Sequence, residues 1–125
     1  DRDGYFMPPT IVRDLPDDAR LVREEQFGPV LPVLKYDDID DVIARANASE
    51  YGLGGSVWGK DLTRATEVAQ KIDTGTVWVN QYLAIDPRIP FRGSKQSGLG
   101  TELGDEGMLE YTQAHIVNAV PFEDA

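Results

Sequence analysis

The amino-acid sequence predicts an α/β fold in which most strands pair in parallel. Segments rich in strand-forming residues alternate with segments whose apolar residues recur at helical spacing, and this alternation is typical of parallel sheets. The chain has 125 residues, of which 41% are hydrophobic and 27% are charged. This size and composition are those of an ordinary globular domain with a core of its own.

The first half of the chain is predicted to contain two strands and a helix. Residues 5–12 are apolar and rich in strand formers, but two prolines confine such a strand to a sheet edge. Residues 21–36 are expected to be extended, with a buried strand at 30–34. Apolar residues at helical spacing predict an amphipathic helix at 38–48, with Asp37 or Asp38 as its N-cap.

The second half continues the alternation of strands and helices. Gly52 is expected to end the first helix in a left-handed conformation, before a short strand at 56–58. Asp61 is predicted to cap a second helix, and residues 76–79 form the next strand. Residues 81–100 have no periodicity, and a long structureless stretch in a compact domain is usually functional or disordered. A short helix at 103–111 and an extended segment at 115–120 follow.

Composition excludes several kinds of site. The chain contains no cysteine and one histidine, so it offers no disulfide, no thiolate metal site and no cysteine nucleophile, and we expect no bound metal. Its formal net charge of −10 argues against binding to nucleic acid or to an anionic membrane. No long apolar run and no signal peptide are present, which favours a cytoplasmic protein.

The charge is unevenly distributed along the chain. Residues 51–100 contain 4 acidic and 6 basic residues, whereas the whole chain is strongly acidic. Arg88, Arg92 and Lys95 fall in one loop, in which Asp86 is the acidic residue. This loop is either an ordinary solvated loop or a pocket for an anion.

Three positions could contact a small molecule. Glu24 and Glu25 are adjacent in an extended segment, so one carboxylate points inward and the other outward. Either both glutamates are solvated charges before a turn, or one of them binds the vicinal hydroxyls of a ribose. Phe27, next to Gly28-Pro29, is either a core residue or a flat surface for a ring. Asn80 ends a strand, where it either caps the turn or faces a ligand.

Three motifs stand out along the chain: residues 24–30 read E-E-Q-F-G-P-V, residues 75–80 read G-T-V-W-V-N, and residues 90–104 contain P-F-x-G-x-K-x-S-G-x-G-x-E-x-G. With these motifs, the sequence resembles the NAD(P)-dependent aldehyde dehydrogenase superfamily. The resemblance covers about residues 4 to 120, with the motifs in the family's order. The matched region is similar to the C-terminal quarter or so of such an enzyme.

The resemblance implies roles for several residues. Glu25 would hold the nicotinamide ribose of NAD or NADP, and Phe27 would lie beside the nicotinamide ring. The loop from Gln81 to Phe91 resembles the wall of the aldehyde tunnel, and Glu102 resembles a glutamate of the proton relay.

The sequence departs from the family's usual residues at three positions, in and after the segment that resembles the tunnel wall. Gln81 stands where small or sulfur-bearing residues are common, Arg92 where many members have glycine, and Thr101 where arginine is frequent. Together with Arg88, Arg92 would bias the tunnel toward an anionic aldehyde.

The resemblance further implies that residues 1–111 belong to a catalytic domain and that residues 112–125 form an oligomerisation strand and tail. The nucleophilic cysteine, the glutamate base and the nucleotide-binding fold precede this region in the family. The sequence therefore predicts part of an aldehyde-oxidising enzyme that is inactive alone and that forms a homo-oligomer, a dimer or tetramer, through its C-terminal strand. The alternative is a non-catalytic interaction module that pairs through the same strand. A related acyl-forming reductase is less favoured.

Overall fold

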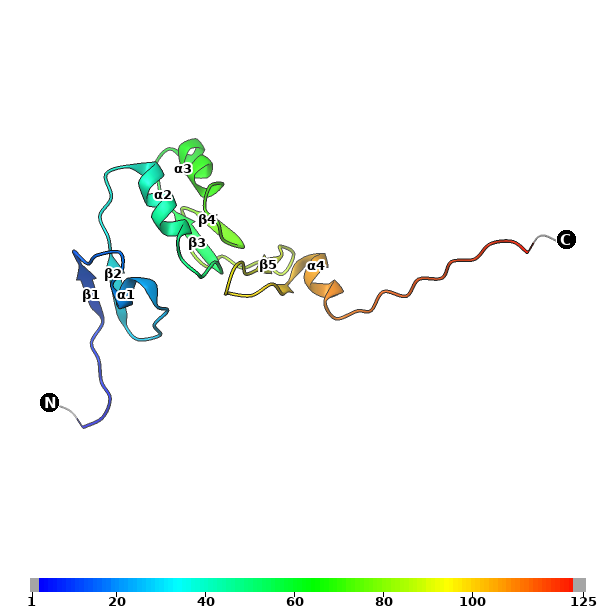
Figure 1. The fold of residues 1–125 in the computed structure, drawn as a ribbon, viewed down its shortest axis with the longest axis horizontal. Coiled ribbons are helices and arrows are strands. Elements are labelled where there is room, and N and C mark those ends of the chain that lie inside the picture. The colour runs from blue at the N-terminus through cyan, green and yellow to red at the C-terminus, as the bar shows by residue number, and fades with distance from the viewer. Residues whose placement is uncertain (1–2, 123–125) are drawn as a thin grey trace. The chain divides into compact units, whose positions relative to one another are not determined.

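The computed structural model describes residues 3–122. The chain divides between residues 49 and 50 into two compact units, which we call unit 1 and unit 2 (Figure 1). Each unit has its own small set of strands and helices, and each is described separately below.

Unit 1 contains a two-stranded parallel sheet and two helices. Its elements are β1 (Thr10–Arg13), α1 (Arg20–Arg23), β2 (Val30–Val33) and α2 (Ile39–Asn47). β1 and β2 run parallel with Thr10 beside Val30. The Asp38 side chain accepts a hydrogen bond of 2.8 Å from the Asp41 backbone N–H, so Asp38 caps α2 as predicted. Ile43 of α2 is buried.

Unit 2 contains a β-α-β arrangement followed by a small antiparallel pair. Its elements are β3 (Gly54–Val57), α3 (Leu62–Ala69), β4 (Thr76–Val79), β5 (Phe91–Arg92), β6 (Thr101–Glu102) and α4 (Gly104–Leu109). β3 and β4 pair in parallel and α3 packs against both, while β5 pairs with β6 in antiparallel fashion. Ala65 and Ala69 of α3 and Trp78 of β4 are the buried hydrophobic residues of unit 2 among those the structure describes.

The α/β class and most element positions agree with the sequence predictions. The helices predicted at 38–48 and 103–111 are α2 and α4, and the Asp61 side chain caps α3 by accepting from the Arg64 backbone N–H at 3.1 Å. Parallel pairing holds for β1–β2 and β3–β4. Within residues 3–122, however, the strands form three separate two-stranded sheets rather than one larger sheet.

Four local predictions were wrong. Residues 21–23, expected to be extended, belong to α1. The strand expected to be buried at 30–34 has exposed side chains at Leu31 and Val33. Gly52 does not have a positive φ; a side chain there would lie 3.1 Å from the Asp73 carbonyl oxygen, so close packing explains the glycine. The stretch 81–100 is not structureless, because it contains β5.

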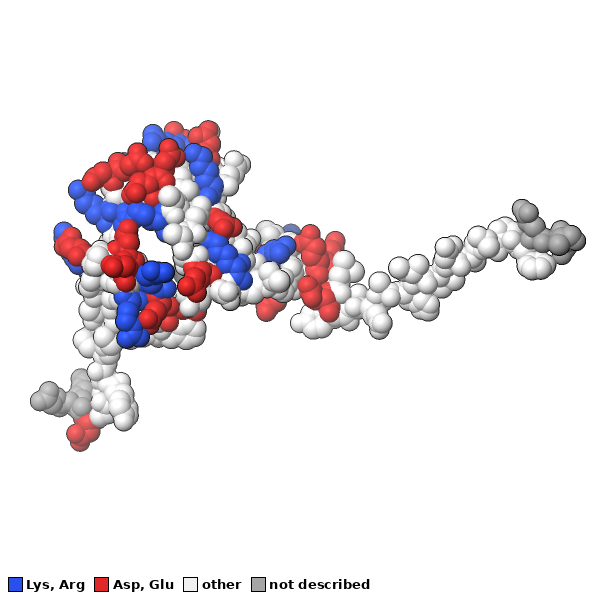
Figure 2. Space-filling view, in the orientation of Figure 1, with Lys and Arg blue, Asp and Glu red and all other residues white. Residues whose placement is uncertain are grey.

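The C-terminal segment forms no helix or strand between residues 113 and 122. All of these residues are exposed, including Ile116, Val117 and Phe122. Residues 111–122 contain no Lys, Arg, Asp or Glu and appear as an uncharged white stretch in Figure 2. Residues 112–122 of the predicted oligomerisation strand and tail therefore form no strand in this structure, and residues 123–125 lie outside the described residues.

Candidate functional site

The two adjacent glutamates at the end of α1 are in different environments. The Arg20 guanidinium donates to both Glu24 carboxylate oxygens, each at 2.8 Å. These hydrogen bonds hold the pKa of Glu24 below its ordinary value. Glu25 makes no hydrogen bond or ion pair with any residue in the described range 3–122. Of the pair, Glu25 is the carboxylate that remains available to a ligand.

Phe27 is presented to solvent rather than packed in a core. Its side chain is 95% exposed and has no ring contact with the described residues. Between Glu25 and Phe27, the Gln26 side-chain amide donates to the Val30 carbonyl oxygen at the start of β2. An exposed carboxylate and an exposed aromatic ring two residues apart fit a nucleoside, whose ribose offers hydroxyls and whose base offers a flat face.

The end of β4 is fixed by Asn80. Its Oδ1 accepts from the Gly59 backbone N–H at 2.8 Å, and its Nδ2 donates to the Gly59 carbonyl oxygen at 2.9 Å. The Asn80 side chain therefore binds the turn that follows β3 rather than the turn after its own strand. By joining the end of β4 to Gly59, Asn80 fixes where the following loop begins.

The loop after Asn80 is attached to the core through Trp78. The indole Nε1 donates to the Ala84 carbonyl oxygen at 2.9 Å, and Tyr82 lies edge-on to the same ring at 6.1 Å. Gln81 is exposed and makes no side-chain hydrogen bond within residues 3–122. The loop is thus ordered, and Gln81 is left free at its beginning.

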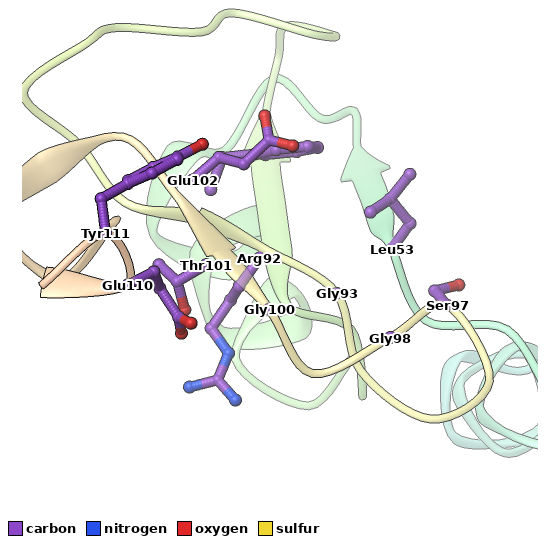
Figure 3. Close-up of a pocket in the computed structure, with 11 residues that line it drawn as sticks. Leu53, Arg92, Gly93, Ser97, Gly98, Gly100, Thr101, Glu102, Glu110 and Tyr111 are labelled. Atoms are coloured by element: carbon purple, nitrogen blue, oxygen red, sulfur yellow. The ribbon is translucent and has the colours of Figure 1, made fainter. Parts of the chain in front are cut away.

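Phe91 and Arg92 lie on opposite faces of β5. The Phe91 ring stacks on Trp78 with centroids 6.2 Å apart, so it faces the core of unit 2. Phe91 is directly opposite Glu102 in the sheet register, and Arg92 is opposite Thr101. Figure 3 shows the Glu102 side chain on one side of the pair and those of Arg92 and Thr101 on the other. Phe91 and Arg92 were predicted together in the tunnel wall, but strand alternation places their side chains on opposite faces of β5.

The three cations of the loop have different partners. Arg88 binds Asp86 through Nε at 2.8 Å and through Nη2, and these hydrogen bonds lower the pKa of Asp86. Lys95 lies 3.2 Å from an Asp73 carboxylate oxygen. Among residues 3–122, Arg92 makes no ion pair. The predicted anion pocket is therefore reduced to a single unneutralised cation.

A pocket of about 320 Å³ lies beside β5 and β6 (Figure 3). Its walls come from the residue before β3, from β5, β6 and the loop 93–100, and from the two residues after α4. The lining residues are Leu53, Phe91, Arg92, Gly93, Ser97, Gly98, Gly100, Thr101, Glu102, Glu110 and Tyr111. Neither Glu110 nor Tyr111 was predicted as a site residue from the sequence. They follow a helix of six residues, which is too short to give a periodic signal that would point to them.

Glycine packing positions Glu102. A Cβ on Gly107 of α4 would lie 2.6 Å from the Glu102 carbonyl carbon, so α4 can lie against β6 only with glycine at this position. The Glu102 carboxylate itself makes no hydrogen bond to a described residue. It is a free acid group beside the pocket.

Within the described residues, no group of three or more His, Cys, Asp or Glu side chains is arranged to hold a metal ion. In the same range, no helix is both long enough and apolar enough to span a membrane.

Comparison with known proteins gives consistent results. The family model described as the aldehyde dehydrogenase family matches residues 1–117. A betaine aldehyde dehydrogenase from Rhizobium leguminosarum is 48% identical over 115 residues, which are 92% of this chain and 24% of that protein. A succinate-semialdehyde dehydrogenase [NADP(+)] from Deinococcus radiodurans is 48% identical over 118 residues, 94% of this chain and 25% of that protein.

Solved structures agree with the sequence matches. An aldehyde dehydrogenase from Bacillus cereus in an NAD+ complex superimposes with a TM-score of 0.84 and 46% identity, covering 90% of this chain and 23% of that one. A Mycobacterium tuberculosis aldehyde dehydrogenase complexed with NAD+ gives a TM-score of 0.83 and 46% identity, covering 88% of this chain and 23% of that one. The chain spans about a quarter of the length of the curated relatives it matches. By its family match and these similarities over most of its length, the chain belongs to the aldehyde dehydrogenase family.

Proposed function

We propose that the chain is part of an enzyme that oxidises an aldehyde to a carboxylic acid with NAD or NADP. The observation that carries the proposal is the environment of Glu25 and Phe27, which are both exposed and free beside the occupied Glu24. Glu25 would accept hydrogen bonds from the nicotinamide ribose, and Phe27 would lie against the nicotinamide ring. The bound dinucleotide would accept the hydride of the aldehyde.

The cofactor assignment is tested in the longer polypeptide that carries these residues. Glu25→Gln removes the charge that accepts the ribose hydroxyls and should raise the Kd for NAD or NADP about tenfold. Glu24→Gln is the matched control, because its carboxylate is already held by Arg20, and it should leave the Kd unchanged. If both variants bind the dinucleotide as tightly as the parent, Glu25 does not hold the ribose.

A second part of the proposal concerns the aldehyde. Gln81, Arg88 and Phe91 would form part of the tunnel wall together with Arg92, and Glu102 would relay a proton behind the nucleophile. Asp86 already neutralises Arg88, so any preference for an anionic aldehyde would come from Arg92. Arg92→Gly should then lower turnover of carboxylated relative to neutral aldehydes. An unchanged ratio would remove Arg92 from the tunnel.

Catalysis requires groups that these 125 residues do not supply. The chain contains no cysteine, so it has no thiol with which to form the covalent intermediate expected of the family. We therefore infer that the 125-residue chain alone oxidises no aldehyde. Formation of NADH or NADPH by the purified chain, followed by absorbance in the presence of aldehyde, would refute this inference.

The C-terminal segment would supply the oligomer contact in the cytoplasm, where we place the protein by analogy with a rat relative named as cytosolic. Residues 112–122 are exposed and include an uncharged apolar stretch that fits addition to a neighbouring sheet edge. Light scattering after size exclusion should show self-association that is lost on truncation after residue 111. A monomeric parent chain would count against this contact.

The alternative, an interaction module without catalysis, uses the same segment. A longer reading frame with a cysteine upstream of Glu25 favours the enzyme, and a frame without one favours the module.

A further inference from the structure

Arg92, Thr101 and Glu110 present three unpartnered polar groups to one side of the β5–β6 pair. Figure 3 shows all three side chains extending to that side, opposite Glu102. None of them makes a side-chain hydrogen bond or ion pair with any residue between 3 and 122. The guanidinium and the carboxylate are thus both unpaired, although they line the same pocket.

The pocket beside them is large enough for a small molecule. Its volume of about 320 Å³ lies at the lower end of the usual range for ligand sites. One wall consists of Gly98 and Gly100, where an added Cβ would meet no atom within 4 Å. The φ of +110° at Gly98 explains why this position is glycine, but Gly100 has no positive φ. Neither the backbone conformation nor the packing of this chain therefore requires glycine at position 100.

The charges of the pocket select the class of ligand. Three charged side chains line the pocket, with Arg92 and Glu110 on one side of the β5–β6 pair and Glu102 on the other. On the side of Arg92, a simple anion would be attracted by Arg92 but repelled by Glu110, whereas a simple cation would be attracted by Glu110 but repelled by Arg92. A molecule that carries both charges satisfies both groups through charge-assisted hydrogen bonds, with the Thr101 hydroxyl as a further partner. We propose that this pocket binds a small zwitterion of the ω-amino acid class, with its carboxylate on Arg92 and its ammonium on Glu110.

The proposal is tested by NMR titration of the 125-residue chain at neutral pH. The probes are unbranched ω-amino acids from glycine to 6-aminohexanoate, with acetate and methylammonium as single-charge controls. We expect shifts in the amide resonances of residues 98–102 and of Glu110, with the tightest binding at one chain length. Each single-charge control should bind about tenfold more weakly than the best zwitterion. Equal binding of acetate or methylammonium, or no shifts at all, would overturn the proposal.

Variants identify the groups that bind. Arg92→Gln and Glu110→Gln should each weaken binding about tenfold. Arg64→Gln and Glu106→Gln are matched controls, because both residues lie outside the pocket, and they should leave binding unchanged. Equal weakening by the controls would show a general charge effect and refute the site.

Folding of each variant is read from the indole N–H resonance of Trp78, which reports its hydrogen bond to Ala84. If Arg92→Gln disturbs that resonance, the variant Arg92→Lys is used in its place. Because lysine keeps the positive charge, Arg92→Lys should bind the zwitterion more tightly than a variant without that charge. The titration uses neither aldehyde nor dinucleotide, so its outcome is independent of the proposed dehydrogenase activity.

Discussion

Asn80 binds Gly59 through both ends of its side-chain amide, with hydrogen bonds of 2.8 and 2.9 Å. Asn80 also occupies the left-handed region with a φ of +55°, a conformation that asparagine tolerates better than most residues. The pair joins the end of β4 to the turn that follows β3. It therefore fixes the point from which the loop containing Gln81 begins.

Replacing Asn80 by alanine should destabilise unit 2. Asn80→Ala removes both hydrogen bonds and places a side chain without local hydrogen bonding in the left-handed region, for a loss of about 1–2 kcal/mol in the free energy of unfolding. Urea denaturation followed by tryptophan fluorescence measures the loss. Asn118→Ala, at an exposed position in the C-terminal segment, is the control and should have no effect. Equal stability of the two variants would mean that the Gly59 contact contributes nothing.

Gly75 should be the least replaceable glycine of unit 2. A Cβ there would lie 1.9 Å from the Arg92 carbonyl oxygen, a backbone atom that cannot rotate away. Gly75→Ala should therefore cost about 3 kcal/mol or more and separate β5 from the start of β4. Gly100→Ala is the matched control, because its Cβ would meet nothing within 4 Å. Similar urea midpoints for the two variants would contradict the close approach of Gly75 to Arg92.

The elements predicted well from sequence are those with local signals. α2 and α3 each begin after an aspartate that caps the first turn, and each carries its apolar residues at helical spacing. Both signals act within a few residues, so the sequence predicts them without knowledge of the tertiary structure. α1 has four residues and no side-chain cap, so neither signal was present.

The features that sequence missed depend on residues far apart in the chain. Gly52 is glycine because Asp73 and Ser94 approach it closely, and this contact has no local signature. β5 exists because residues 91–92 pair with residues 101–102, and this pairing assigns Phe91 and Arg92 to opposite faces. The family motifs identified Glu25 and Phe27 by position, but only the structure shows that Arg20 holds Glu24 and leaves Glu25 free.

The ion pair between Arg45 and Asp17 should make unit 1 sensitive to acid. The Arg45 guanidinium donates to both Asp17 carboxylate oxygens at 2.7 and 2.8 Å, and these bonds lower the pKa of Asp17 below its ordinary value of 3.8. A carboxyl group whose pKa is lower in the folded state than in the unfolded state stabilises the folded protein at pH values above the unfolded pKa. This stabilisation is lost as the pH falls from about that value through the lower folded pKa.

The Asp17 pKa can be measured directly by carboxyl carbon NMR. Arg45→Gln should raise the pKa of Asp17 toward its ordinary value, because the first cause of the shift is the hydrogen bond from Arg45. Arg13→Gln is the matched control, since the Arg13 guanidinium pairs with Asp14 rather than Asp17. An Asp17 pKa that is the same in the parent chain and in Arg45→Gln would rule out this ion pair in solution.

Trp78 and Trp58 provide a matched comparison of a core residue with an exposed one. Trp78 is 6% exposed and its indole N–H holds the loop through the Ala84 carbonyl oxygen, whereas Trp58 is 65% exposed and its indole N–H reaches the neighbouring Ser56. Trp78→Phe leaves the Ala84 carbonyl without its donor and opens space against Phe91, so it should cost about 2–3 kcal/mol. Trp58→Phe should cost less than about 0.5 kcal/mol, as surface substitutions do. Hydrogen exchange of residues 81–89 should accelerate in Trp78→Phe alone; acceleration in neither variant would show that the loop does not depend on the indole.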